Sequence, residues 1–161
     1  MIYLDYTANT PADPAVLDAF IAAERRYIAN PNSTHIAGQQ ARAEMDRVTS
    51  SIAQRLGVQP AEIIYTSGAS EANNLAVKGI AQAARHIGKH IISTELEHSS
   101  VGASLSVLQE QGYEIDLLRI GRDGRVDLDQ LRELLRDDTV LVAVCAVDSE
   151  LGTVQPIQEI A

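Results

Sequence analysis

The stretch Ile63–Asn74 reads IIYTSGASEANN, and it indicates the fold class of the whole chain. Its first residues, Ile63 to Tyr65, are β-branched or aromatic and predict a short buried strand. The next residues, Thr66 to Ser70, are small enough for the backbone to approach a ligand, and Gly68 frees φ at the turn. A helical pattern follows. The stretch therefore predicts a strand, a tight turn and a helix, which is the repeating unit of α/β proteins.

The same turn offers a place for an anion. Ser70 is a candidate N-cap, and Glu71 falls in the first turn of the helix. Because a helix N-terminus presents free N–H groups and the positive end of a dipole, it suits a phosphate. The turn is not a P-loop, since Lys78 lies too far away, and it lacks the dinucleotide fingerprint. From these residues alone, a phosphate cradle and an ordinary strand-to-helix turn both remain open.

The composition is that of a globular domain. The chain has 161 residues, 45% of them apolar and 22% charged, which is enough for one domain with a real core. Its net charge of −9 argues against nucleic acid and against an anionic membrane surface as partners. No apolar run approaches the ~20 residues of a membrane span. The start, MIYLDYTANTP, lacks a signal-peptide pattern, and the single cysteine cannot form an internal disulfide, so we expect a cytoplasmic protein.

Helical and strand patterns alternate along the chain. Because crossovers of a dozen or more residues imply parallel strands, we expect an α/β fold with a mostly parallel sheet and helices on both faces. The first helix begins at Asp13-Pro14, a cap followed by a proline suited to the first turn. Further helices are expected at about 38–56, from the turn to about 85, at about 99–111 and at 127–136. Strands are expected at 63–65, 90–93, 113–118 and 139–147.

Polar side chains follow the predicted strands. Because binding sites of parallel sheets lie beyond the carboxyl ends of the strands, these segments would converge if their strands are neighbours. His98 is the chemically versatile member, since an imidazole can stack on a ring or transfer protons, although a lone histidine can equally be a surface residue. We expect Glu97 beside it to be solvated. The four segments are Ser67–Ser70, Thr94–His98, Ile120–Asp123 and Asp148–Glu150.

The sequence gives little sign of a metal or a nucleophile. His35, His86 and His90 show no ligand spacing with one another or with Cys145, so we expect no metal site. Cys145 lies within an apolar run, where a buried and inert thiol is expected. The polar loop Asn30–His35 has turn chemistry typical of a connector, with room for a role at a site.

Five segments together resemble a known family. In order along the chain, they resemble the N-terminal portion of the cysteine desulfurases, pyridoxal-phosphate enzymes of the class V aminotransferase group. This resemblance implies fold type I, with a mostly parallel seven-stranded sheet in a large domain and a small domain built from both chain ends. We then expect residues 1–12 to be an arm near the substrate entrance, and 13–161 to be the first, incomplete part of the large domain. The segments are IYLDYTANTP, NPNSTH, IIYTSGASEANNLAVKG, TELEHSSV and VDSELGTVQPI.

The resemblance also implies an activity and a partner set. The family acts as homodimers with pyridoxal 5′-phosphate. It removes sulfur from L-cysteine, giving alanine and a protein persulfide that supplies iron–sulfur clusters or thio-cofactors, often through a scaffold protein that accepts the sulfur. By this resemblance, His98 would be catalytic, stacking on the cofactor ring and helping proton transfer. The remaining site residues would be Gly68, Ala69, Ser70 and Ser149 at the cofactor and Asn9, Asn32 and His35 at the substrate entrance.

Several positions depart from the family pattern. Ser70 replaces the usual threonine and keeps a hydroxyl, Asp148-Ser149 replaces a usual Asn-Asn pair, and Asn9 replaces a threonine. The family's Schiff-base lysine, the aspartate at the pyridine nitrogen and the persulfide cysteine all lie beyond the matching portion. We therefore expect this chain alone to be a poor catalyst, either as a truncated product or as one piece of a split enzyme that a second chain completes. Two alternatives stay open: a non-catalytic interaction or regulatory module with the same fold, and a related lyase acting on selenocysteine or cysteine sulfinate.

Overall fold

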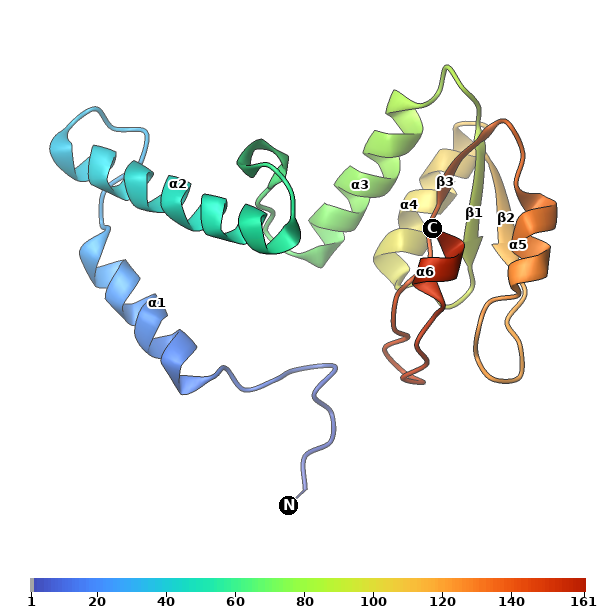
Figure 1. Ribbon diagram of the computed structural model, residues 1–161, viewed down its shortest axis with the longest axis horizontal. Coiled ribbons are helices and arrows are strands. Elements are labelled where there is room, and N and C mark those ends of the chain that lie inside the picture. Colours follow the sequence, from blue (N-terminus) through green and yellow to red (C-terminus); the bar gives the residue numbers. More distant parts are fainter. Residues whose placement is uncertain (1) are drawn as a thin grey trace. The chain divides into compact units, whose positions relative to one another are not determined.

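The computed structural model describes residues 2–161. The chain divides into two compact units, the first ending at Tyr65 and the second beginning at Thr66 (Figure 1). None of the helices in the described residues is long and apolar enough to cross a membrane. The first unit contains α1 (Pro14–Arg26), α2 (Ile36–Leu56) and the 3-10 helix η1 (Pro60–Glu62). The second contains α3 (Ala69–Ala83), β1 (His90–Thr94), α4 (Ser99–Glu110), β2 (Glu114–Leu118), α5 (Leu128–Leu134), β3 (Thr139–Val142) and α6 (Ile157–Ile160).

The start of the first unit agrees with the sequence pattern. Residues 2–13 form no helix or strand, and Met1 lies outside the described residues. The Asp13 carboxylate then accepts a hydrogen bond from the backbone N–H of Ala15 at 2.8 Å, and Pro14 is the first residue of α1. The predicted cap is thus confirmed. The division into an arm of residues 1–12 and a large-domain part from residue 13 stays a prediction.

The helix α2 begins two residues earlier than expected because His35 caps it. The His35 Nδ1 accepts a hydrogen bond from the backbone N–H of Gly38 at 3.2 Å. A side chain at Gly38 would lie 2.5 Å from the carbonyl oxygen of Ser33 and 2.8 Å from that of Asn30. The glycine therefore lets the polar loop fold closely against the helix. At the other end, Gly57 ends α2 with φ 69°, as predicted.

The predicted strand Ile63–Tyr65 is wrong. The backbone is extended at Ile63, with φ −85° and ψ 120°, but the segment pairs with no strand of residues 2–161. Ile64 is 68% exposed and Tyr65 60% exposed, so neither side chain is buried as expected. The residue types favour an extended backbone here, but a strand also needs a neighbouring strand to bond to.

The second unit is built on a parallel sheet in the order β2-β1-β3. The connection from β1 to β2 runs through α4 in one direction, and the connection from β2 to β3 passes back over β1 through α5. Because parallel crossovers are right-handed, this reversal places the two helices on opposite faces of the sheet. The predicted α/β fold, with a parallel sheet and helices on both faces, is confirmed (Figure 1).

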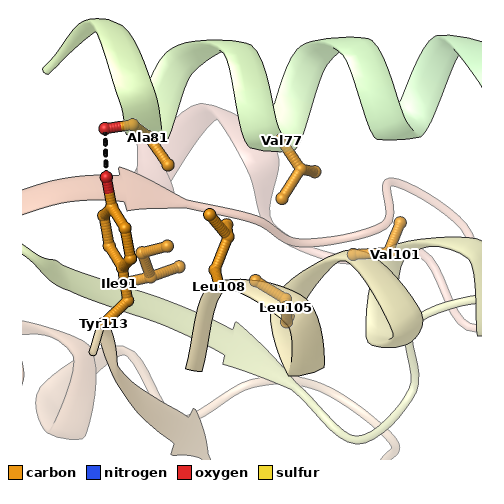
Figure 2. Close-up of a cluster of buried hydrophobic side chains, with 7 residues drawn as sticks. All are labelled: Val77, Ala81, Ile91, Val101, Leu105, Leu108 and Tyr113. Carbon is orange, nitrogen blue, oxygen red and sulfur yellow. Dashed lines mark hydrogen bonds between the residues drawn. The ribbon is translucent and has the colours of Figure 1, made fainter. Parts of the chain in front are cut away.

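Each face of the sheet has its own apolar core. The neighbours Ile91 and Ile92 on β1 point to opposite faces, and both are completely buried. On the α3 and α4 face, Figure 2 shows the Tyr113 hydroxyl donating to the carbonyl oxygen of Ala81 at 2.7 Å, which ties the start of β2 to the end of α3. That core comprises Val77, Ala81, Ile91, Val101, Leu105, Leu108 and Tyr113, and the opposite core comprises Ile92, Leu118, Val126 and Leu131.

The strand β3 is shorter than the predicted 139–147. It ends at Val142, and its residues are only half-buried, not buried on both faces as expected. Its last paired residue, Val142, lies opposite Ile92, and one further backbone bond follows, from the Ala143 N–H to the carbonyl oxygen of Ile92 at 2.9 Å. A side chain then bonds to the segment after β3: the Ser93 hydroxyl donates to the carbonyl oxygen of Ala143 at 2.9 Å.

Candidate functional site

The candidate site of the second unit is centred on His98, which lies between β1 and α4. His98 is the N-cap of α4, and its Nδ1 accepts a hydrogen bond from the backbone N–H of Ser100 at 3.2 Å. Its ring is exposed, although β1 before it is fully buried. A rigid strand therefore delivers an accessible imidazole to the carboxyl edge of the sheet.

A chain of hydrogen bonds reaches His98 from a different helix. The Asn73 amide on α3 donates to the Ser100 hydroxyl oxygen at 2.8 Å, and that hydroxyl lies 2.8 Å from the His98 Nδ1. Sequence reasoning missed both Asn73 and Ser100. The one signal was the pair of adjacent asparagines inside a helix, since asparagine there competes with the backbone and is disfavoured without a tertiary partner.

His98 and Ser149 line one cavity of about 440 Å³. Its two walls are the segment after β1 and a small hairpin loop after β3. The loop is held by Asp148, whose carboxylate accepts hydrogen bonds from the backbone N–H groups of Glu150 at 3.0 Å and Leu151 at 2.5 Å. Two of the four polar segments predicted to meet therefore do so. The lining residues are Glu95, Leu96, Glu97, His98, Ser99, Asp148, Ser149, Glu150 and Leu151.

Glu97 is not solvated as expected, but joins the two walls. Its Oε1 accepts hydrogen bonds from the Thr94 hydroxyl at 3.0 Å and from the backbone N–H of Cys145 at 2.7 Å. Glu97 and His98 also line a second cavity, of about 360 Å³, together with Asn73, Cys145 and other residues.

Cys145 is half-buried at this second cavity, not fully buried as expected. Burial raises the pKa of its thiol above the ordinary value, and the carboxylates of Glu97 and Asp148 raise it further. These effects favour the neutral thiol over the thiolate. This agrees with the inert role that we expect for it.

The N-terminus of α3 differs in detail from the prediction. Gly68, not Ser70, is the N-cap, and no side chain caps the helix there. Glu71 lies in the first turn as expected, but its carboxylate folds back and accepts hydrogen bonds from Ser67, at 2.6 Å from the backbone N–H and 2.7 Å from the hydroxyl. These bonds lower the pKa of Glu71, the backbone bond contributing most. Within residues 2–161, the N–H groups of Ala69 and Ser70 donate to no acceptor.

The other predicted residues lie elsewhere. Asn9, Asn32 and His35 belong to the first unit and are exposed. The Asn32 side-chain oxygen accepts a hydrogen bond from Arg42 at 2.9 Å, and His35 caps α2. The Ile120–Asp123 segment lines a separate cavity of about 640 Å³, so it does not join the other strand ends. Among residues 2–161, no three His, Cys, Asp or Glu side chains gather in a group suited to a metal ion.

Comparison with known proteins decides the family. Residues 2–161 match the family model described as "Aminotransferase class-V". This chain belongs to the class-V aminotransferase family. Within the family, it is 43% identical over 160 residues to the mitochondrial cysteine desulfurase of Arabidopsis thaliana. The alignment covers 99% of this chain and 35% of that relative. The resemblance to the cysteine desulfurases is thus confirmed.

Solved structures agree on the fold. A NifS-like protein superposes with a TM-score of 0.93 at 34% identity, over 99% of this chain and 44% of its own. A structure titled "SspA in complex with cysteine" superposes with a TM-score of 0.87 at 36% identity, over 98% of this chain and 46% of its own. The chain therefore spans between a third and a half of the length of these matched proteins.

Proposed function

We propose that this chain forms part of a cysteine desulfurase, an enzyme that uses pyridoxal 5′-phosphate to remove sulfur from L-cysteine. The observation that carries the proposal is the shared cavity of His98 and Ser149, in a chain 43% identical to a cysteine desulfurase. Membership of the class-V family implies the cofactor, and the cysteine bound in a structural relative supports the substrate class.

The N-terminus of α3 fits the phosphate of this cofactor. Gly68, Ala69 and Ser70 are exposed, and an added Cβ at Gly68 would meet no atom within 4 Å. The free N–H groups of Ala69 and Ser70 and the positive end of the helix dipole suit an anion. Glu71 is bound to Ser67, so these two N–H groups remain available. In this proposal, the phosphate lies on Gly68, Ala69 and Ser70.

His98 and Ser149 fit the ring end. The exposed imidazole of His98 offers a flat face for the pyridine ring, and the Ser149 hydroxyl, on the opposite wall of the cavity, can donate to the phenolic oxygen. When bound, the cofactor supplies an electron sink for the substrate carbon. His98 would orient the ring and hold or move a proton beside it.

Other features of the enzyme are part of the same proposal. The family's Schiff-base lysine and persulfide cysteine would belong to the part of the enzyme that residues 1–161 do not cover, so these residues by themselves would have little activity. The assembled enzyme would act as a homodimer and pass the persulfide sulfur to a scaffold protein for iron–sulfur clusters or thio-cofactors. Asn9, Asn32 and His35 would lie at the substrate entrance, and the cytoplasm would keep Cys145 reduced.

An activity assay tests the proposal. The protein is co-expressed with the part of the Arabidopsis relative that lies outside the matching region, and supplied with pyridoxal phosphate, L-cysteine and a thiol reductant. We expect alanine and sulfide in equal amounts. Because positioned acid–base groups contribute about 10²–10⁴-fold, His98→Ala lowers the rate by about that factor. A cofactor-loaded complex that forms neither product would contradict the proposed function.

A further inference from the structure

The imidazole of His98 is held at one nitrogen by two donors. The backbone N–H of Ser100 lies 3.2 Å from Nδ1, and the Ser100 hydroxyl lies 2.8 Å from the same atom. The other ring nitrogen, Nε2, has no hydrogen-bond partner within residues 2–161. The ring is therefore asymmetric, with one bonded and one free nitrogen.

The direction of these bonds is set by groups that can only donate. A backbone N–H cannot accept, so Nδ1 must be the acceptor of the 3.2 Å bond. The Asn73 amide nitrogen also only donates, and it is bonded to the Ser100 oxygen at 2.8 Å. The hydroxyl hydrogen of Ser100 is then left to point at Nδ1. Both donors thus require a lone pair on Nδ1, and the proton of the neutral ring belongs on Nε2.

We propose that Asn73 and Ser100 are positioning residues that fix His98 in its Nε2–H tautomer. The free nitrogen of the neutral ring then offers a hydrogen-bond donor, not a lone pair, to the molecule that occupies the cavity. A proton could be accepted only at Nδ1, against both donors of Ser100.

Burial makes this arrangement rigid. Ser100 is 8% exposed and Asn73 is half-buried, so water does not readily replace either partner. The Ser104 hydroxyl, completely buried, holds the carbonyl oxygen of Ser100 at 2.9 Å. Asn73 also lies one turn beyond Ala69 on α3. If the proposed function holds, the same chain of bonds keeps the ring-binding histidine in register with the phosphate-binding helix end.

Substituting Asn73→Asp tests the proposal, because it reverses the polarity of the chain of bonds. A carboxylate only accepts, so the Ser100 hydroxyl turns toward it and presents its lone pairs to Nδ1. The tautomer is read from the ¹⁵N shifts of the His98 ring in the full protein without cofactor. In the unmodified protein, we expect a pyridine-type Nδ1 and a pyrrole-type Nε2. In Asn73→Asp, the Ser100 backbone N–H still donates to Nδ1 but the hydroxyl no longer does, so we expect the two ring signals to move toward each other.

Two matched controls accompany this test. Asn74→Asp adds the same charge one residue further along α3, where the side chain contacts Ser70 and Lys78 and not Ser100, and should leave the His98 signals unchanged. If Asn73→Asp loses its folded amide spectrum, Ser100→Ala takes its place, with Ser106→Ala as its control on the same helix. Ser100→Ala should move the two ring signals toward each other.

The results of this tautomer measurement can be distinguished from the results of the activity assay that tests the proposed function. A pyrrole-type Nδ1 in the unmodified protein would overturn the inference, as would ring signals in Asn73→Asp identical to those of Asn74→Asp. Because the tautomer is measured without cofactor, these results do not depend on whether the protein binds pyridoxal phosphate or acts on L-cysteine.

Discussion

The carboxylate of Glu97 accepts a hydrogen bond of 2.7 Å from the backbone N–H of Cys145, which lies 48 residues further along the chain. The same oxygen accepts from the Thr94 hydroxyl at 3.0 Å. Glu97 thereby joins the end of β1 to the segment that follows β3, where regular strand pairing has stopped. The two walls of the His98 cavity are thus held by a side chain and not by the sheet.

Removing this carboxylate should destabilise the second unit. Glu97→Ala leaves the Cys145 N–H and the hydroxyl of the buried Thr94 without their acceptor, and an unsatisfied buried donor costs about 1–3 kcal/mol. Glu97→Gln keeps a carbonyl acceptor and should lose less. Urea unfolding followed by circular dichroism measures the change. Glu95→Ala is the control, since Glu95 is exposed on the same cavity wall and makes no side-chain hydrogen bond within residues 2–161. Equal stability of the Glu97→Ala and Glu95→Ala variants would contradict the role given to Glu97.

The Cys145 thiol should respond to the same substitution. Its pKa is raised by burial and then by the carboxylates of Glu97 and Asp148, so Glu97→Gln removes one cause and lowers the pKa. The rate of alkylation by iodoacetamide, followed against pH, should rise at a lower pH in the variant. Because the chain has a single cysteine, the reaction reports on this site alone. An unchanged pH profile in Glu97→Gln would show that the carboxylate does not act on the thiol.

The raised pKa of Cys145 also predicts how stability depends on pH. The folded state holds the thiol proton more tightly than the unfolded state does. The contribution of this thiol to the free energy of unfolding is therefore fully present below the pKa of the unfolded state, about 8.5. It is lost as pH rises through the higher pKa of the folded state. Urea unfolding across this range should show a decline that is smaller in Cys145→Ala. An equal loss of stability with rising pH in Cys145→Ala would mean that other groups cause the decline.

The core between α4 and the sheet should dominate the stability of the second unit. Leu108 is completely buried there, so Leu108→Ala should cost about 2–5 kcal/mol through lost burial and a residual cavity. The matched control is Leu117→Ala on β2, where the side chain is 44% exposed and little burial is lost. Chemical denaturation compares the two variants. Similar losses in both would mean that the core is not where the structure has it.

The buried hydroxyl of Tyr113 should have its own effect. Tyr113→Phe keeps the ring in the core but removes the donor to the carbonyl oxygen of Ala81, 2.7 Å away. Because that oxygen belongs to the end of α3 and is left unpaired, we expect a loss of about 1–3 kcal/mol. Amide exchange in the last turn of α3 should quicken in the same variant. A fully stable Tyr113→Phe protein with unchanged exchange would contradict this view of the helix end.

Local signals in the sequence predicted most helix boundaries. Asp13-Pro14 and Gly57 act within one turn of the chain, so their roles could be predicted from neighbouring residues alone. The strand at Ile63–Tyr65 could not be judged this way, because a strand depends on a partner that its own residues do not specify. The early start of α2 could not be predicted in this way, because histidine is not among the preferred N-cap residues.

The candidate site was predictable only at the level of strand ends. The parallel order of β1 and β3 brings His98 and Ser149 to one cavity, as expected for such a sheet. The contacts that orient His98 were not predictable. Asn73 and Ser100 are 27 residues apart, and their hydrogen bond depends on how α3 packs on α4. Glu97 likewise looked like a solvated neighbour, because its partner Cys145 is distant in sequence.

The most direct test of the account is a binding measurement with 4′-deoxypyridoxine phosphate. This analogue has the ring and phosphate of the cofactor but no aldehyde, so it cannot react with surface lysines. It is titrated into ¹⁵N-labelled protein, and 4′-deoxypyridoxine without phosphate is the control. We expect the phosphorylated analogue to shift the amide signals of Ala69 and Ser70 and the ring signals of His98, and the control to leave the Ala69 and Ser70 signals unmoved. Saturating analogue with no shift at these residues, or equal shifts with and without the phosphate, would contradict it.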